Sequence, residues 1–446
     1  MRAPQLRPGP ARRSVLVAGL SAGALATAAC TGEDRRPAAS AGSPSPDTRG
    51  WTQLPAPPLQ APVLRAGSAC VWTGRQVLLW GGSTPRKDGC AISTTADGAA
   101  WTPGPRGDGS WTTMAAAPVE ARSFAQFWWT GSGAVLVGGQ DLWAACESRP
   151  AGRLDVALFT PDDGAGSWQR LPDLPWPAGT TVAASTWAAG RVLAWAPAVG
   201  AWSLGLGEPA WTPLPAPPLD VPGTAVADVH GCWTGSRWLV LGRVWPDPRS
   251  TAPAVDVGLA YDPLRTTWDE LDPGPLTGTH AGAVWSGTRL FGFDPAEGLS
   301  SLDPGTGRWT ATAPGPLDDL GAYSPDGGPV VAWTGTSVLV WGGARGGRDT
   351  GMCIDGNGPD DPAFAYGGEC NPAPGLLGAA YDAANDTWRP IADGPWQRRA
   401  ASAAVWTGDS LFLAGGVDLE EQRTGRPPPF PDHPEAAAAL FTPGRA

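Results

Sequence analysis

One short pattern of hydrophobic and polar positions recurs along the chain. An aromatic residue, usually Trp, is followed by Thr or Ser and then Gly, and an apolar run closing on glycines comes next. The clear copies are CVWTGRQVLLWGG from Cys70, FWWTGSGAVLVGG from Phe127, GCWTGSRWLVLG from Gly231, AVWSGTRLFGF from Ala283, VAWTGTSVLVWGG from Val331 and AVWTGDSLFLAGG from Ala404. A degenerate seventh copy, STWAAGRVLAWAP from Ser185, lacks the closing glycines, and we expect its turn to be one residue longer. Self-similarity of this kind is the signature of a repeat architecture.

Each copy predicts two short antiparallel strands around a tight turn, in which Gly supplies a positive φ. A further phrase follows, such as GLAYDPLRTTW or GAAYDAANDTW, and predicts a third strand, a polar turn and a Trp that opens a fourth strand. The fourth-strand tryptophans are Trp51, Trp111, Trp168, Trp211, Trp268, Trp309 and Trp388.

The two ends of the repeat region fit together. The last copy, around Trp406, supplies three strands and ends without a fourth, whereas Trp51 opens a fourth strand that nothing precedes. A ring in which Trp51 to Leu54 completes the last sheet leaves no unpaired edge. The sequence therefore predicts an all-β fold, a seven-bladed β-propeller over residues 51–446 that is closed by the N-terminal strand.

The order YD, W, P, R, GG resembles the kelch repeat. The resemblance implies a propeller whose first strands line a central channel and whose fourth strands lie outermost. It does not specify an activity, because kelch propellers include scaffolds, sugar-binding proteins, mutarotases and copper oxidases. A copper site like that of galactose oxidase is not expected, because the chain has only 3 His and 4 Tyr and lacks that family's local motifs.

The repeated tryptophans allow two interpretations. Aromatic faces stack on sugars, so the tryptophans could bind carbohydrate. Their recurrence at one structural position in every blade instead favours packing between neighbouring sheets.

The N-terminal segment, residues 1–29, has the features of an export signal. Arg12 and Arg13 precede an apolar run that is too short for a permanent membrane helix. RRSVL resembles a twin-arginine signal and TAAC resembles a bacterial lipobox, which implies a lipid on Cys30 and a place on the outer face of the cell membrane. Thr27 stands where a lipobox usually has Leu, so an ordinary cleavage site near Cys30 remains the alternative. Residues 30–50 are expected to form a flexible polar tether.

Long segments between the second and third strands would emerge on one face of the ring. They run roughly over Ser83 to Gly98, Gln140 to Leu154, Arg243 to Val257, Ala344 to Leu377 and Val417 to Glu435. Irregular segments gathered on one rim of a rigid scaffold usually carry function, so we expect the binding surface there.

Three arginines occupy one repeat position near this face. Arg65, Arg122 and Arg399 each lie seven residues before the turn Trp, in three blades that are consecutive around the ring. They could form a cluster that binds a carboxylate or an anionic sugar through bidentate contacts, and His280 could join them. The kelch resemblance implies the other interpretation, in which each arginine ties its blade to the preceding loop.

The cysteines fit an oxidising compartment. Cys353 and Cys370 share one long segment, and Cys90 and Cys146 occupy corresponding segments of neighbouring blades, so both pairs are candidate disulfides. Cys70 and Cys232 fall in first strands of non-adjacent blades and are expected to be buried thiols.

Charge and motifs narrow the possible partners. A net charge of −11 argues against nucleic acid. The acidic loop DGNGPDD at Asp355 fits a solvated loop better than a calcium site, and no other metal or cofactor motif appears. We expect a monomeric, lipid-anchored extracellular binding or scaffold protein for a saccharide, a cell-wall fragment or a protein partner. The alternative is a sugar-active enzyme, such as a mutarotase or epimerase, with its site at the channel mouth.

Overall fold

The computed structural model describes most of the repeat region. The described residues are 50–60, 65–85, 92–105, 108–141, 151–197, 199–219, 226–245, 253–277, 282–294, 297–317, 329–342, 378–392, 394, 399–400, 402–418 and 437–444. The chain is divided into two units, Met1–Ser45 and Pro46–Ala446, and all described residues belong to the second. None of the described helical residues forms a segment long and apolar enough to span a membrane.

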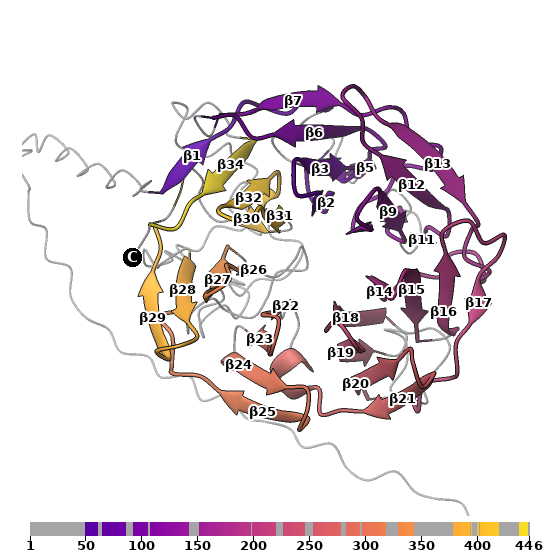
Figure 1. The fold of residues 1–446 in the computed structure, drawn as a ribbon, viewed down its shortest axis with the longest axis vertical. Helices are drawn as coiled ribbons and strands as arrows, with labels where there is room; N and C mark the ends of the chain where they lie inside the picture. The colour runs from indigo at the N-terminus through magenta and orange to yellow at the C-terminus, as the bar shows by residue number, and fades with distance from the viewer. Residues whose placement is uncertain are drawn as a thin grey trace, which may run out of the picture. The chain divides into compact units, whose positions relative to one another are not determined.

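The second unit is a ring of seven four-stranded antiparallel sheets (Figure 1). From the innermost strand outward, blade 1 contains β2 (Ala69–Trp72), β3 (Val77–Trp80), β6 (Gly98–Thr102) and β7 (Ser110–Thr113). Blade 2 contains β8 (Gln126–Trp129), β9 (Ala134–Val137), β12 (Val156–Thr160) and β13 (Ser167–Leu171). Blade 3 contains β14 (Ala184–Ala188), β15 (Arg191–Ala196), β16 (Gly200–Gly205) and β17 (Thr212–Pro213).

The remaining blades repeat this order. Blade 4 contains β18 (Val226–Trp233), β19 (Trp238–Trp245), β20 (Val255–Asp262) and β21 (Thr267–Glu270). Blade 5 contains β22 (Gly282–Trp285), β23 (Leu290–Asp294), β24 (Gly298–Asp303) and β25 (Arg308–Ala311), preceded by the short 3-10 helix η2 (Gly274–Thr277). Blade 6 contains β26 (Val330–Trp333), β27 (Ser337–Trp341), β28 (Gly378–Asp382) and β29 (Thr387–Pro390). Blade 7 contains β31 (Ala403–Trp406), β32 (Leu411–Ala414), β34 (Ala438–Phe441) and β1 (Trp51–Gln53).

The N-terminal strand closes the ring, as the sequence predicts. β1 pairs antiparallel with β34, in a register that places Trp51 opposite Phe441 and Gln53 opposite Ala439. The two rings at the start of this ladder are in contact, with centroids 5.1 Å apart. Blade 7 is thus built from both ends of the repeat region, and β1 covers the edge of β34.

The turns of the inner hairpins follow from the repeated Thr-Gly pair. Thr73 Oγ1 accepts the Gln76 N–H at 2.9 Å and donates to the Gln76 carbonyl at 3.0 Å, while Gly74 has a φ of 89°. Hydroxyls in five other blades close the same turn: Thr130, Thr234, Ser286, Thr334 and Thr407.

The expected longer turn in blade 3 is wrong. Trp187 pairs with Val192, the same separation as between Trp72 and Val77. Without a Thr hydroxyl to close the loop, the ladder continues for one more pair. Ala189 and Gly190, with φ of 48° and 76°, then make a tight two-residue turn.

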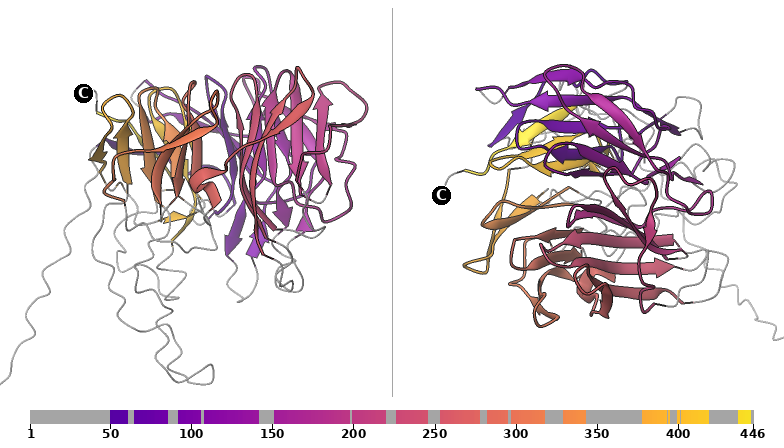
Figure 2. Two further views of the ribbon diagram at one scale, coloured as in Figure 1. Left: turned by 90° about the horizontal axis from the view of Figure 1, so that it is seen from below. Right: turned by 45° about the vertical axis from the view of Figure 1, so that its right-hand side comes forward.

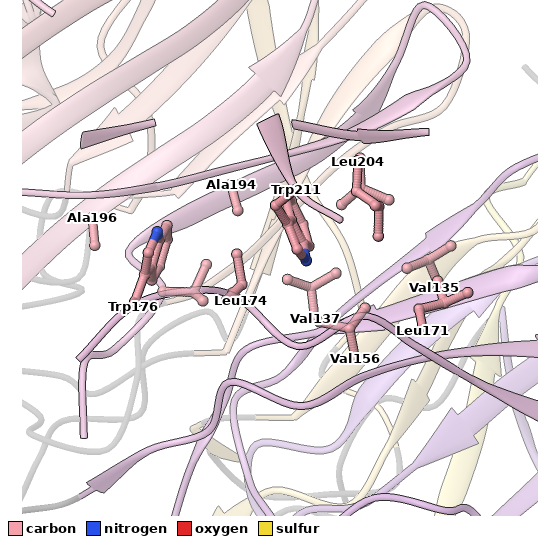
Figure 3. Close-up of a cluster of buried hydrophobic side chains, with 12 residues drawn as sticks. Val135, Val137, Val156, Leu171, Leu174, Trp176, Ala194, Ala196, Leu204 and Trp211 are labelled. Atoms are coloured by element: carbon pink, nitrogen blue, oxygen red, sulfur yellow. The ribbon is translucent and has the colours of Figure 1, made fainter. Parts of the chain in front are cut away.

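The hydrophobic core lies in the seams between neighbouring blades. The cluster between blades 2 and 3 combines residues such as Val135 and Val156 of one blade with Ala194 and Leu204 of the next (Figure 3). Each of the seven clusters contains one Trp from the end of an innermost strand and one fourth-strand Trp. These pairs are Trp72 and Trp111, Trp129 and Trp168, Trp187 and Trp211, Trp233 and Trp268, Trp285 and Trp309, Trp333 and Trp388, and Trp406 and Trp51. The packing interpretation of the tryptophans is confirmed.

The fourth-strand tryptophans also link the blades by hydrogen bonds. Trp111 Nε1 donates at 2.8 Å to the carbonyl of Pro55, which lies four residues after Trp51 in blade 7. Every other fourth-strand Trp makes the equivalent bond to the preceding blade: Trp168 to Ala115, Trp211 to Pro172, Trp268 to Pro215, Trp309 to Asp272, Trp388 to Ala313 and Trp51 to Ala392. With the bond from Trp51 in blade 7 to blade 6, these seven hydrogen bonds link every blade to the preceding one around the whole ring.

We expect closure by β1 to be required for stability. Deleting Trp51 to Leu54 should lower the melting temperature sharply, because it exposes the edge of β34 and removes a packed Trp whose loss alone costs about 3–5 kcal/mol. Trp51→Phe, which keeps an aromatic ring but loses the indole N–H, should cost only about 1 kcal/mol. Thermal unfolding followed by circular dichroism measures both. A deletion variant that melts with the parent would show that the ring closes in another way.

Candidate functional site

The connections from second to third strands define one face of the ring, which we name the loop-bearing face. Figure 2 shows the blades from the side, with their strands running between this face and the opposite one. The bases of several connections are strand pairs rather than irregular loops. In blades 1 and 2 they are β4 (Ser83–Pro85) with β5 (Ile92–Thr94) and β10 (Gln140–Asp141) with β11 (Ala151–Gly152). In blade 7, β33 (Val417–Asp418) of this connection pairs with β30 (Arg399–Ala400), which lies before the first strand. These ladders satisfy backbone groups that a loop would leave to water.

Arg65 forms a buried ion pair at the start of blade 1. Its side chain is 1% exposed, and Nη1 and Nη2 donate to Asp97 Oδ1 and Oδ2 at 2.7 and 3.0 Å. Nη1 also donates to the Gly81 carbonyl at 3.1 Å, and Nη2 donates to the Gln60 carbonyl. Burial alone would raise the pKa of Asp97, but hydrogen bonds from Arg65 and the Gln60 N–H outweigh it and lower the pKa.

Arg122 repeats the same arrangement in blade 2. Its side chain is fully buried and its Nη2 lies 2.5 Å from Asp155 Oδ2. Nε donates to the Glu120 carbonyl, and Nη1 donates to the carbonyls of Gly138 and Asp155. Burial lowers the pKa of Arg122, opposed by the Asp155 charge. Burial also tends to raise the pKa of Asp155, but the charge of Arg122 and the Glu120 N–H bring it below its usual value.

The backbones of both arginines tie neighbouring blades together. The Gly82 N–H of blade 1 donates to the Arg122 carbonyl at 2.9 Å, and the Gly416 N–H of blade 7 donates to the Arg65 carbonyl at 2.7 Å. A Cβ on Gly81 would lie 2.7 Å from the Arg122 carbonyl oxygen, and one on Gly415 would lie 2.2 Å from that of Arg65. The glycine pairs of blades 1 and 7 are therefore needed where the arginine of the next blade approaches.

These contacts favour the structural interpretation of the arginines in blades 1 and 2. The guanidinium groups of Arg65 and Arg122 are directed to an aspartate and to backbone carbonyls of their own blades, which fits structural ties. The backbone of Arg399 pairs with Asp418 in the β30–β33 ladder. In blade 7, Ala437 occupies the position of Asp97 and Asp155, directly before the third strand. The side chain of Arg399, and His280 altogether, lie outside the described residues.

A second charge network sits beside Arg122. Arg153, 25% exposed, pairs with Asp141 at 2.7 Å and with Glu120. Thr94 of blade 1 donates to Asp141 at 3.4 Å, so the network bridges two blades. The sequence interpretation missed Asp141 and Arg153 because both lie in a segment expected to be irregular, in which the β10–β11 ladder brings them together.

Phe124 is the other residue that the sequence interpretation missed. Its side chain is 41% exposed, its φ is 57°, and its N–H donates to the Gly67 carbonyl of blade 1 at 2.7 Å. The available sequence signal is the comparison of blades: the residue two after Arg65 is Gly67, whereas the residue two after Arg122 is Phe124.

The described cysteines, Cys70 and Cys232, are free thiols, as predicted, but both residues are partly exposed rather than fully buried. Burial raises the pKa of both Cys70 and Cys232 to about 12, although the Cys70 thiol donates to the Ala404 carbonyl at 3.2 Å. Thiols with such a pKa are unreactive near neutral pH. His230, on the same strand as Cys232, has a pKa lowered by burial and partly restored by Asp228.

Several predicted residues cannot be placed. Cys30, the acidic loop at Asp355 and the two candidate disulfides, Cys353 with Cys370 and Cys90 with Cys146, lie outside the described residues, so they stay predictions. Within the described ranges, no group of three or more His, Cys, Asp and Glu side chains could hold a metal ion.

We expect the Arg122–Asp155 pair to be structural. Arg122→Met should destabilise the protein by about 3–5 kcal/mol, because it leaves a buried carboxylate without its cation. The matched control is Arg170→Met, since Arg170 pairs with Asp173 at 2.9 Å but is half exposed, and its loss should cost less than about 1 kcal/mol. Denaturation in urea measures both.

The effect of Arg122→Met should depend on pH. The folded-state pKa of Asp155 is lowered, so the pair stabilises fully above the unfolded pKa of about 4 and loses this contribution as the pH falls through the folded value. The difference in the free energy of unfolding between the parent and Arg122→Met should therefore shrink in acid.

Equal losses of stability in Arg122→Met and Arg170→Met at neutral pH would contradict the structural role of Arg122.

Comparison of the sequence with known families and curated proteins finds no match. No family model matches the chain, and no curated protein matches it. The chain is therefore characterised by its own geometry, which is that of a seven-bladed propeller.

Proposed function

We propose that this protein is a kelch-type propeller, anchored outside the cell by a lipid on Cys30, whose loop-bearing face binds a saccharide, a cell-wall fragment or a protein partner. The observation that carries the proposal is where the blades differ. Second and third strands are joined directly in blade 5, between Asp294 and Gly298, but widely separated in blade 6, between Trp341 and Gly378. Variation confined to one face of a uniform scaffold is typical of a recognition surface.

The roles of the repeated residues support the kelch-type assignment. The tyrosine of the YD pair in blade 6, Tyr381, donates to Asp386 at 2.8 Å, and Asp386 also accepts the Ala313 N–H of blade 5. The fourth-strand Trp, the arginine and the glycine pair each hold one blade against its neighbour. In these blades the repeated residues therefore hold neighbouring blades together.

Binding is favoured over sugar-active catalysis by the state of the charged groups. Catalysis at the channel mouth needs titratable groups that converge on a substrate. Arg65 and Arg122 are instead buried and paired within their own blades. A binding role needs only an accessible surface with fixed hydrogen-bonding groups.

Lipid attachment at Cys30 predicts the location of the protein. Cys30→Ala should release it from the membrane fraction into the medium, because the mature protein then lacks an acyl anchor. Fractionation and immunoblotting of the parent and the variant measure this. Membrane retention of the variant would exclude the lipid anchor.

The binding role is tested with the released Cys30→Ala protein on an array of glycans, peptidoglycan fragments and cell-surface proteins. We expect a retained partner, and we expect its loss when residues 343–377 are replaced by the short blade 5 connection, residues 295–297. The replacement should leave the melting temperature unchanged, because the blade 6 strands are already paired without it. Turnover of an array sugar would favour the enzyme, and retention of the partner by the replacement variant would remove this segment from the surface.

A further inference from the structure

Phe124 occupies a backbone position that suits glycine. Its φ of 57° matches the 64° of Gly67, the equivalent residue of blade 1. Left-handed backbone is strained for a residue with a Cβ. The other non-glycine residues with positive φ in the described ranges are Ala189, Thr266 and Asp386, all in tight turns between strands. Phe124 instead lies two residues before β8, where an innermost strand begins.

Packing does not explain why a phenylalanine is there. Phe124 is 41% exposed, and the other exposed large hydrophobic residues in the described ranges are Leu206, at 37%, and Leu264, at 92%. Both leucines lie in connections between third and fourth strands, on the face opposite the loop-bearing one. Phe124 is therefore strained in its backbone and poorly buried in its side chain, a combination that favours a role in recognition.

The ring of Phe124 is held in place rather than free. Its carbons lie against Gly67 so closely that a Cβ built on that glycine would meet them at 2.9 to 3.0 Å. The Phe124 N–H also donates to the Gly67 carbonyl. One side of the ring is thus supported by blade 1, at the seam between the innermost segments of blades 1 and 2, and the rest is presented to solvent.

The polar groups of the same seam are fixed and partly exposed. Ser123, next to Phe124, pairs with Gln140, and the following residue Asp141 holds Arg153. Asp141, Arg153 and Asp97 are 21%, 25% and 33% exposed. Hydrogen-bonding groups that are fixed at the same seam as an exposed aromatic ring suit a ligand with an apolar ring face and hydroxyl groups at its edge, which describes a pyranose.

The charges and the exposed apolar surface at this seam favour a neutral saccharide over an anionic sugar or a protein partner. The guanidinium groups of the seam already pair with carboxylates and the chain carries a net charge of −11, so an anionic sugar gains little. A protein partner would need a contiguous apolar patch, whereas the described part of this seam exposes one aromatic ring. The surface therefore favours a neutral saccharide.

We propose that Phe124 is the stacking residue of a neutral-saccharide site at the seam of blades 1 and 2. The inference rests on the proposed binding function and names its ligand class. In this proposal Phe124, rather than Arg65 or Arg122, contacts the ligand.

The decisive variant is Phe124→Gly, because glycine relieves the backbone strain while it removes the ring. Its melting temperature should equal or exceed that of the parent, since a glycine accepts this φ. Its affinity for methyl glycosides of neutral hexoses and N-acetylhexosamines should fall about tenfold or more. Leu264→Gly removes an exposed apolar side chain from the opposite face and should leave the affinity unchanged.

Saturation-transfer NMR with these glycosides measures binding, and fluorine-labelled phenylalanine reports on the ring. The Phe124 resonance, assigned by its absence from the glycine variant, should shift on addition of the bound glycoside. Unchanged affinity in Phe124→Gly, or a melting temperature lowered by several degrees, would overturn the role of Phe124. Absence of glycoside binding by the parent would overturn the saccharide assignment. The binding role of the loop-bearing face would still be decided separately, by the segment replacement on the array.

Discussion

The ring depends on one repeated hydrogen bond, from the indole of each fourth-strand Trp to a carbonyl of the preceding blade. A single bond of this kind contributes about 1 kcal/mol, but its geometry fixes the distance and angle between two sheets. The bond from Trp51 to Ala392 joins blade 7 to blade 6, so the series of bonds runs around the whole ring and no blade can move without affecting its neighbours. The same indoles fill the hydrophobic seams, so packing and polar pairing select one arrangement.

A different set of contacts positions the loop-bearing face. The buried pairs Arg65–Asp97 and Arg122–Asp155 hold the start of each first strand to the start of its third strand. Hydrogen bonds from Gly82 to the Arg122 carbonyl and from Gly416 to the Arg65 carbonyl then join each of these strands to the neighbouring blade. The face thus has a rigid base in blades 1 and 2, and Phe124 is held on that base with a backbone that the surrounding contacts dictate.

The sequence was sufficient for the number of sheets and for the closure of the ring, although not for the turn of the degenerate copy in blade 3. Recurrence of Trp111 and its equivalents predicts seven sheets, and the missing fourth strand after Trp406 predicts closure by Trp51. It was insufficient where one residue acts alone. The partner of Arg65 is distant in sequence, so its role could not be decided before Asp97 was seen against it. The left-handed φ of Phe124 leaves no mark in the sequence beyond a glycine at the equivalent place in blade 1.

Closure by β1 has a mechanical consequence. Gly50 joins directly to the closing strand, so tension on the preceding chain enters the propeller at Trp51. The load is borne first by a ladder of three residue pairs and by one indole bond. A pull on the chain would therefore open the ring at the seam between blades 6 and 7 and at the outer edge of blade 7, before it strained the seam of blades 1 and 2. The propeller is weakest under force where its two ends meet, and the seam that carries Phe124 is not the first to be loaded.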